Sequence, residues 1–193
     1  TPIPTETATP EPPPVPQAAP EGWVKFESEQ IEFWLPANYV GGDMIKKKND
    51  TIRQISALQT KKIKLNLDSL KKAPPELVLV MYDKNLSLGL QTAVYVNKYT
   101  RTPETELQSF VDEMISKLPG SVSIFGTRKT TVLGREAQKI ELEQRISGST
   151  INATFYYIKN GADFWVIDYD YQPVDVVNMG QVIDTSIKTL NFK

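Results

Sequence analysis

The residues of this chain that could do chemistry begin with three carboxylates near its end. Asp168 and Asp170 lie two positions apart, so on a strand they share one face, and Asp163 lies nearby in the sequence. Carboxylate oxygens are the ligands that hard cations such as Ca²⁺ prefer, which makes these three residues the candidate metal site. The alternative interpretation is a solvated strand end, because no EF-hand spacing accompanies them.

A second feature is a run of positive charge in residues 44–73 of a chain whose formal net charge is −1. We name these cations the basic region: Lys46, Lys47, Lys48, Arg53, Lys61, Lys62, Lys64, Lys71 and Lys72. Only Asp50 and Asp68 oppose them within this segment. Such a region could contact anionic lipid headgroups, a wall polymer or an acidic partner, or it could be the solvated faces of two helices. Nucleic acid is not expected, because few aromatic residues interleave with the cations to stack on bases.

Cysteine and histidine are absent from the sequence. This excludes a thiol nucleophile, a disulfide framework, a Cys/His zinc site and a Ser-His-Asp triad. We therefore expect that the protein is not an enzyme and that it binds no cofactor. The alternative is a hydrolase or small-ligand carrier that uses a cleft lined by carboxylates or tyrosines. Six tyrosines that fall on predicted strands could line such a cleft or pack in the core: Tyr95, Tyr99, Tyr156, Tyr157, Tyr169 and Tyr171.

Alternation predicts the elements that position these residues. Four consecutive antiparallel strands are expected at 121–132, 135–147, 150–159 and 163–171. In the last of them, one face carries Trp165, Ile167, Tyr169 and Tyr171, which we expect to lie beneath a helical layer. Asn160-Gly161 between two such runs is typical of a type I′ hairpin turn, because both residues tolerate a positive φ.

The rest of the chain is predicted to extend and cover this meander. The other expected elements are strands at 23–26 and 31–36, a loop at 37–43, helices at 44–59 and from 67, strands at 77–82 and 88–99, helices at 103–118 and from 173, and a strand at 190–192. Asp43 is expected to cap the first helix, and Thr102-Pro103-Glu104 to open the third. The last helix is expected to face inward with Val176, Val177, Gly180, Ile183 and Ile187. This pattern predicts an α+β fold, an antiparallel sheet flanked by helices.

The domain organisation follows from composition. Residues 1–22 are rich in Pro, Thr, Ala and Glu, and such a segment cannot bury enough apolar surface to order itself, so we expect a disordered Thr/Pro-rich tether. Residues 23–193 are expected to form one domain, with 40% hydrophobic residues in the whole chain. No apolar run approaches the roughly 20 residues needed to span a bilayer. The chain has no initiator methionine and no signal peptide, so we expect a processed or trimmed product.

The order of motifs resembles PsbP-like domains. The resemblance is carried by Trp23-x-x-Phe26, Ile31-x-Phe33-x-Leu35-Pro36, Ile124, Thr131-x-Leu133-Gly134-Arg135-Glu136-Ala137, Phe164-Trp165-Val166-Ile167 and Ile183-x-x-Ser186-Ile187. It implies an αβα sandwich, a fold shared by the PsbP extrinsic protein of photosystem II, a eukaryotic Ran-binding protein and many bacterial lipoproteins of unknown function. The metal positions of plant PsbP cannot be carried over, because this chain has no histidine. The Thr/Pro tail is similar to that of the bacterial lipoprotein branch.

These observations lead to three functional hypotheses. The first is an extracytoplasmic, lipid-anchored and non-catalytic binding or assembly module, held at the membrane or cell envelope by an anchor upstream of Thr1, with an anionic surface or an envelope protein as its partner. The second is the small-ligand carrier or hydrolase described above, which would require a pocket with convergent, desolvated acids. The third is a structural accessory subunit of an envelope complex. Fold alone does not choose among them.

Overall fold

The four predicted strands of the meander are present in the computed structural model, which describes residues 15–59, 66–85, 92–146 and 148–193. They form one half of a seven-stranded antiparallel sheet with the order β3-β4-β5-β9-β8-β7-β6. Its strands are β3 (Tyr39–Asp43), β4 (Leu77–Asp83), β5 (Ala93–Thr100), β6 (Val122–Val132), β7 (Arg135–Ile146), β8 (Ser149–Asn160) and β9 (Asp163–Tyr171). The predictions made for residues 1–14, 60–65, 86–91 and 147 lie outside the described residues.

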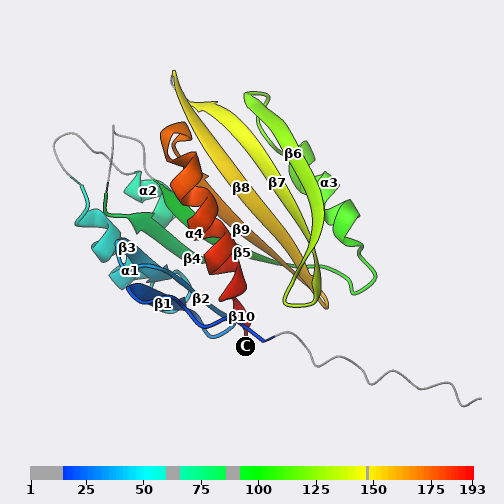
Figure 1. Ribbon diagram of the computed structural model, residues 1–193, viewed down its shortest axis with the longest axis horizontal. Helices are drawn as coiled ribbons and strands as arrows, with labels where there is room; N and C mark the ends of the chain where they lie inside the picture. Colours follow the sequence, from blue (N-terminus) through cyan, green and yellow to red (C-terminus); the bar gives the residue numbers. More distant parts are fainter. Residues whose placement is uncertain (1–14, 60–65, 86–91, 147) are drawn as a thin grey trace, which may run out of the picture.

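A second, smaller sheet and the last helix cover one face of the large sheet (Figure 1). The small sheet contains β1 (Trp23–Glu27), β2 (Ile31–Pro36) and β10 (Asn191–Phe192), in the order β1-β2-β10. The last helix, α4 (Val176–Lys188), follows a 3₁₀ turn at Pro173–Asp175. The core beneath them contains Trp165, Ile167, Tyr169 and Tyr171, so the aromatic face predicted for β9 lies under a helical layer as expected.

Three helices lie against the other face. They are α1 (Lys48–Ser56), α2 (Leu67–Lys71) and α3 (Leu107–Ser116). Helices α1 and α2 bury Ile55 and Leu70 against Val80 of β4, while α3 buries Phe110 against Phe164 of β9. The second face is therefore covered in two separate places, and the α+β sandwich predicted from the sequence is confirmed. No helix in the described part of the chain is long and apolar enough to cross a membrane.

The prediction of a loop at residues 37–43 is wrong for most of that segment, because β3 lies there and pairs with β4. Two glycines allow this pairing. Gly41 and Gly42 have φ angles of 135° and 151°, which residues with a side chain rarely adopt. A Cβ atom on Gly41 would lie 2.1 Å from the carbonyl oxygen of Val80. The glycine pair therefore permits a close strand contact instead of marking a flexible connection.

Two helices begin later than their sequence caps predicted. Asp43 does accept hydrogen bonds through Oδ1, from the backbone N–H groups of Ile45 (2.7 Å) and Lys46 (3.0 Å), but these close a turn and α1 begins only at Lys48. Likewise α3 begins at Leu107 and not at Pro103.

The late start of α3 has a tertiary cause. The Nζ atom of Lys159 donates to the backbone carbonyls of Pro103 (3.3 Å) and Thr105 (2.6 Å). In a regular helix from Pro103 these carbonyls would accept from N–H groups of the next turn. A lysine from β8 therefore holds the predicted first turn outside the helix.

The inward face of α4 also differs from the prediction. Ile183 and Ile187 are buried as expected, together with Met179 and Ser186. In contrast, Val176, Val177 and Gly180 are exposed. The face with Ser186 lies toward the sheet, where the hydroxyls of Ser186 and Tyr169 form a 2.7 Å hydrogen bond.

Candidate functional site

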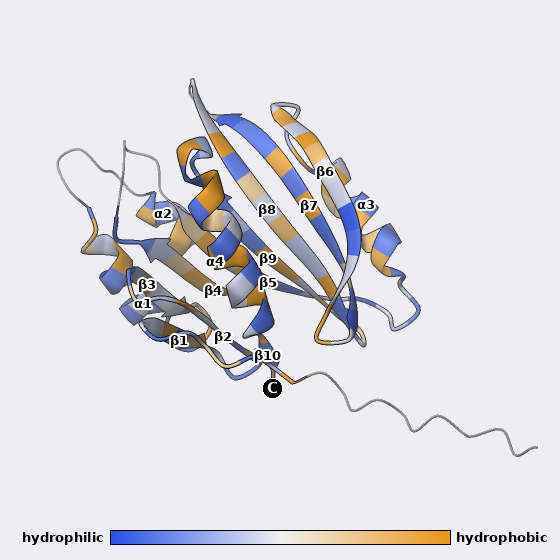
Figure 2. Cartoon of the chain, in the orientation of Figure 1, coloured by the Kyte–Doolittle hydropathy of each residue, from blue (hydrophilic) through white to orange (hydrophobic). Residues whose placement is uncertain are grey.

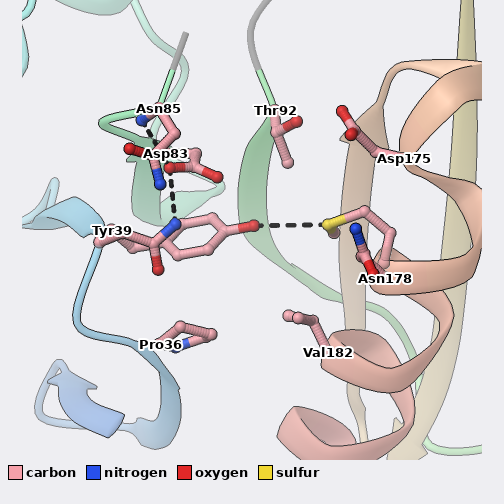
Figure 3. Close-up of a pocket in the computed structure, with 10 residues that line it drawn as sticks. Pro36, Tyr39, Asp83, Asn85, Thr92, Asp175, Asn178 and Val182 are labelled. Carbon is pink, nitrogen blue, oxygen red and sulfur yellow. Dashed lines mark hydrogen bonds between the residues drawn. The ribbon is translucent and has the colours of Figure 1, made fainter. Parts of the chain in front are cut away.

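A groove of about 510 Å³ opens where the first half of α4 meets the ends of β3, β4 and β5 (Figure 3). Its polar lining consists of two carboxylates, three carboxamides and a hydroxyl: Asp83, Asp175, Asn38, Asn85, Asn178 and Thr92. This volume lies within the range of small-ligand sites in proteins, roughly 300–1,000 Å³. We therefore take the groove as the candidate site.

The position of the left wall in Figure 3 follows from strand register. Tyr39 of β3 pairs with Asp83 of β4, and both lie on this wall. Asn38 precedes Tyr39 and therefore lies at the same sheet end as Asp83. The Oδ1 atom of Asp83 accepts two hydrogen bonds of 2.7 Å, from Nδ2 of Asn38 and from the backbone N–H of Asn85. Both donors use the same oxygen, which leaves Oδ2 of this carboxylate available to a ligand.

The opposite wall comes from the other end of the sequence. Asp175, Asn178, Met179 and Val182 follow the spacing of a single helix face, and all four line the groove. The hydroxyl of Tyr39 donates to the Sδ atom of Met179 across 3.6 Å, which connects the two walls at the floor. Tyr39 is buried, and this burial raises the pKa of its hydroxyl, so the floor is neutral and largely apolar.

The groove is electronegative. Burial raises the pKa of the Asp83 carboxyl, and the charge of Asp175 acts in the same direction, whereas the hydrogen bonds from Asn85 and Asn38 and the charge of the nearby Lys84 oppose the shift. The influence of Asp175 on Asp83 shows that the two carboxyls interact across the groove. Within the described residues, no lysine or arginine lines the groove, and neither carboxylate belongs to an ion pair.

The three carboxylates predicted as a metal site are not brought together. Along β9 odd and even residues face opposite sides, so Asp163 lies on the α4 side while Asp168 and Asp170 lie on the other. Asp163 is already occupied, because it accepts from the hydroxyl of Thr100 (2.9 Å) and pairs with Nζ of Lys98 (2.9 Å). Among the described residues no group of three or more Asp, Glu, His or Cys is placed to hold a metal ion.

Asp168 and Asp170 instead form a hydrogen-bonded carboxyl pair on the face opposite to α4. Asp168 keeps part of its surface exposed, but its Oδ1 atom is buried and has no hydrogen-bond partner. Burial raises the pKa of Asp168 well above its usual range, and burial raises the pKa of Asp170 to about 6. The pair therefore shares a proton, with Asp168 as the donor. Nearby, the hydroxyls of Tyr82 and Tyr95 form a 2.9 Å hydrogen bond.

The basic region has fewer unpaired cations than its sequence indicates. Three of its cations form ion pairs: Lys46 with Glu29, Arg53 with Asp50 (2.8 Å) and Lys71 with Asp68 (3.1 Å). Glu29 lies in the β1–β2 turn, so this partner was not evident from the segment itself. Three other members have no ion pair with a described residue: Lys47, Lys48 and Lys72. The remaining members, Lys61, Lys62 and Lys64, lie outside the described residues.

The tyrosines are mostly core residues. Tyr156, Tyr157, Tyr169 and Tyr171 are buried, while Tyr95 and Tyr99 are partly exposed on the other face of the sheet. None of these six lines the groove. Sequence reasoning missed the groove because its walls come from three distant segments; the available signal was a polar residue at the end of each.

Comparison with known proteins identifies the fold. A scan of family models gave no match, and a search of curated proteins gave none either. Among solved structures, cyanobacterial PsbP from Synechocystis sp. PCC 6803 matches with a TM-score of 0.55 at 10% identity, over 91% of this chain and 95% of that one. The chain therefore has a PsbP-like fold, as its motifs predicted. At this identity the similarity concerns the fold alone.

Two further structures are similar. A protein of unknown function from Pseudomonas aeruginosa matches with a TM-score of 0.50 at 10% identity, over 57% of this chain and 78% of that one. LpqN of Mycobacterium tuberculosis, described as involved in cell envelope biogenesis, matches with a TM-score of 0.46 at 11% identity, over 95% of this chain and 86% of that one.

Proposed function

We propose that this protein is a non-catalytic binding module that holds a positively charged group in the groove between α4 and the ends of β3 and β4. The observation that carries the proposal is the pair of carboxylates on opposite walls, Asp83 and Asp175, neither of which forms an ion pair with a residue that the structure describes. Two like charges in a partly desolvated site repel each other, and a cation between them relieves that repulsion.

The remaining lining favours an ammonium or guanidinium group on an aliphatic stem. The carbonyl oxygens of Asn38, Asn85 and Asn178 can accept hydrogen bonds from such a group, whose nitrogens are donors only. The floor of Tyr39, Met179 and Val182 offers apolar surface to the methylenes of the stem. A lysine or arginine side chain has both parts.

The same proposal includes a location outside the cytoplasm, on a flexible tether that leads to a membrane anchor. Its support is the Pro- and Thr-rich composition of residues 1–22. Fractionation of cells that express the full gene would test it. Recovery of the protein in the cytoplasmic fraction would contradict this part of the proposal and leave the groove untouched.

The groove is tested by NMR titration of the full chain with Nα-acetyl-lysine amide and Nα-acetyl-arginine amide. We expect shifts of the backbone amides of Asp83, Asn85 and Asn178 that weaken as salt increases. Nα-acetyl-norleucine amide, which lacks the charge, is the matched ligand control and should produce none.

The variant D83N/D175N should lose the response, because asparagine keeps the shape and the acceptor oxygen but not the charge. D184N is the matched control, since Asp184 lies exposed on the same helix outside the groove. Equal shifts from norleucine amide, or an unchanged response in the double variant, would overturn the proposal.

A further inference from the structure

The edge strand β6 leaves one side of the large sheet open. The strand order places β3 at one edge of the sheet and β6 at the other. Strand β3 has five residues and contacts α1 and β1. Strand β6 has eleven residues, and β7 is the only described element with which it makes more than marginal contact. Every second residue of such a strand directs its backbone N–H and C=O groups away from its neighbour, where another strand can pair with them.

The first part of β6 is apolar and exposed. Ile124 and Phe125 have 40% and 63% of their surface exposed. The register with β7 shifts between Ile124 and Gly126, so Phe125 is the extra residue of a β-bulge and has no partner on β7. In Figure 2 the upper part of β6 is orange and pale, and the part below it is blue. Exposed aromatic side chains are enriched where proteins associate, so this end of β6 offers an apolar contact beside the open edge.

The second part of β6 is cationic. Arg128 and Lys129 are exposed, and neither forms an ion pair with a residue that the structure describes. Arg128 lies opposite a further cation, Lys139 of β7, which pairs with Glu141 (2.9 Å). Successive strand residues point to opposite faces, so the open edge presents one cation on each face of the sheet.

These charges decide which strand can pair with β6. Opposite charges on directly paired strand residues attract, and like charges destabilise the pairing. A second copy of this chain would bring its own Arg128 and Lys129 against the same stretch, which is unfavourable. A nucleic acid or an anionic membrane would neutralise the cations but has no backbone amides to pair with the edge. An extended protein segment with adjacent acidic residues satisfies both the backbone groups and the cations.

We infer that β6 accepts, as an added strand, an extended segment of a partner protein with two adjacent acidic residues against Arg128 and Lys129 and an aromatic or aliphatic residue against Phe125. Backbone hydrogen bonds at the edge supply the affinity, and the charged and apolar side chains select the sequence. No residue of β6 lines the groove, so this surface is separate from it. The inference therefore stands or falls independently of the proposed function.

The test is an NMR titration of the full chain with the peptide Ac-Thr-Val-Glu-Glu-Thr-Val-Phe-Thr-NH2. We expect shifts of the backbone amides of β6 and slower hydrogen exchange of those that point away from β7. The same peptide with two lysines in place of the glutamates should bind at least about tenfold more weakly, because two attractive cross-strand pairs become repulsive. A peptide with proline at its second and fifth positions lacks a backbone donor on each of its edges and should not bind.

Charge reversal on the protein is the sharpest variant. R128E/K129E should reverse the preference, so that the lysine peptide binds more tightly than the glutamate peptide. K47E/K72E is the matched control, because it changes the net charge equally at two exposed lysines that form no ion pair with a described residue. This control should keep the preference of the wild type.

The apolar contact is tested by F125S, which should weaken binding of the glutamate peptide several-fold. V177S is its control, because Val177 is 74% exposed but lies on α4. Equal binding of the glutamate and lysine peptides, no binding of the glutamate peptide, or undiminished binding of the proline peptide would overturn the inference. Self-association in sedimentation that F125S abolishes would mean that a second copy pairs along β6, and the inferred partner would be wrong.

Discussion

Two pairs of carboxyl groups in this molecule are partly removed from water, and the two pairs differ in how the negative charge is stabilised. In the groove, Asp83 and Asp175 stand on separate elements, and Asp83 receives two donors on one oxygen. On β9, Asp168 and Asp170 stand on one strand and bond to each other. The first pair keeps charge that a ligand can neutralise, whereas the second neutralises itself by holding a proton.

The comparison shows that desolvation alone does not make an acid a binding site. The Asp168–Asp170 pair has the stronger pKa perturbation, but neither of its residues lines the groove. The groove has the weaker perturbation, and it has volume, donors and acceptors. We therefore expect the β9 pair to act on stability and the groove pair to act on binding, and the following predictions test that division in order of effect.

The largest expected effect is the pH dependence of stability. The pKa of Asp170 in the folded protein is raised to about 6, above the value of about 3.9 expected in the unfolded chain. The folded state therefore holds a proton that the unfolded state releases, so this stability is complete below about pH 4 and is lost as pH rises through 6. The raised pKa of Asp168 acts in the same direction, so urea unfolding at pH 4.5 and 7.5 should show a loss of at least about 2 kcal/mol that D168N/D170N lacks. A wild type that gains stability over this interval would contradict the shared proton.

A somewhat smaller effect is expected for the single variant D168N. Its amide can donate to Asp170 at every pH, and it avoids the free-energy cost of keeping a proton on Asp168 at a pH well above the usual pKa of an aspartate. The free energy of unfolding at pH 7.5 should rise by about 1–2 kcal/mol, because each unit of raised pKa costs about 1.4 kcal/mol. D83N is the matched variant in the groove and should leave the free energy nearly unchanged. A destabilised D168N with a stable D83N would reverse the division.

The variant N38A probes the groove from its supporting side. It removes the donor of the 2.7 Å hydrogen bond to Asp83, so we expect a loss of about 1 kcal/mol in the free energy of unfolding. Asp83 should also become harder to ionise, and the affinity for acetyl-lysine amide should fall several-fold. N178A removes a lining carboxamide without a recorded bond to Asp83 and is the control for stability. Unchanged affinity in N38A would show that Asp83 needs no support from this residue.

The smallest effect concerns the surroundings of the β9 pair. Y95F removes the 2.9 Å hydrogen bond with Tyr82 and should lower the free energy of unfolding by about 0.5–1 kcal/mol. The midpoint of the pH transition should stay the same, because the two aspartates bond to each other and not to Tyr95. A shifted midpoint would mean that the tyrosines belong to the same proton-sharing network.

Much of the fold was predictable because period-two alternation is strong in β7, β8 and β9 and their turns contain glycine. The errors arose where tertiary contacts outweighed local signals. Gly41 is typical of a loop in the sequence, but in the structure its lack of a Cβ atom allows a close contact with Val80. Pro103 is typical of a helix start, but Lys159 donates hydrogen bonds to the backbone carbonyls of Pro103 and Thr105 in the expected first turn.

The sites were less predictable than the fold. Asp163 and Asp168 are an odd number of residues apart on one strand, so the sequence alone places them on opposite faces and argues against a shared metal site. The meeting of Asp83 with Asp175 was not available, because it depends on how β4 and α4 lie relative to each other. The exposure of Val177 depends on the rotation of α4 about its own axis. The periodicity of the sequence leaves that rotation undetermined at the start of the helix.

One contact at the far end of α4 gives the molecule a direction. The backbone N–H of Gln17 donates to the carbonyl of Lys188 across 2.8 Å, and Val15 lies beside Ile187 and Lys188. The groove opens at the other end of this helix, about 20 Å away along thirteen residues. Val15 and Gln17 thus lie at the opposite pole of the molecule from the groove, so a partner can reach the opening without meeting this end of the described chain.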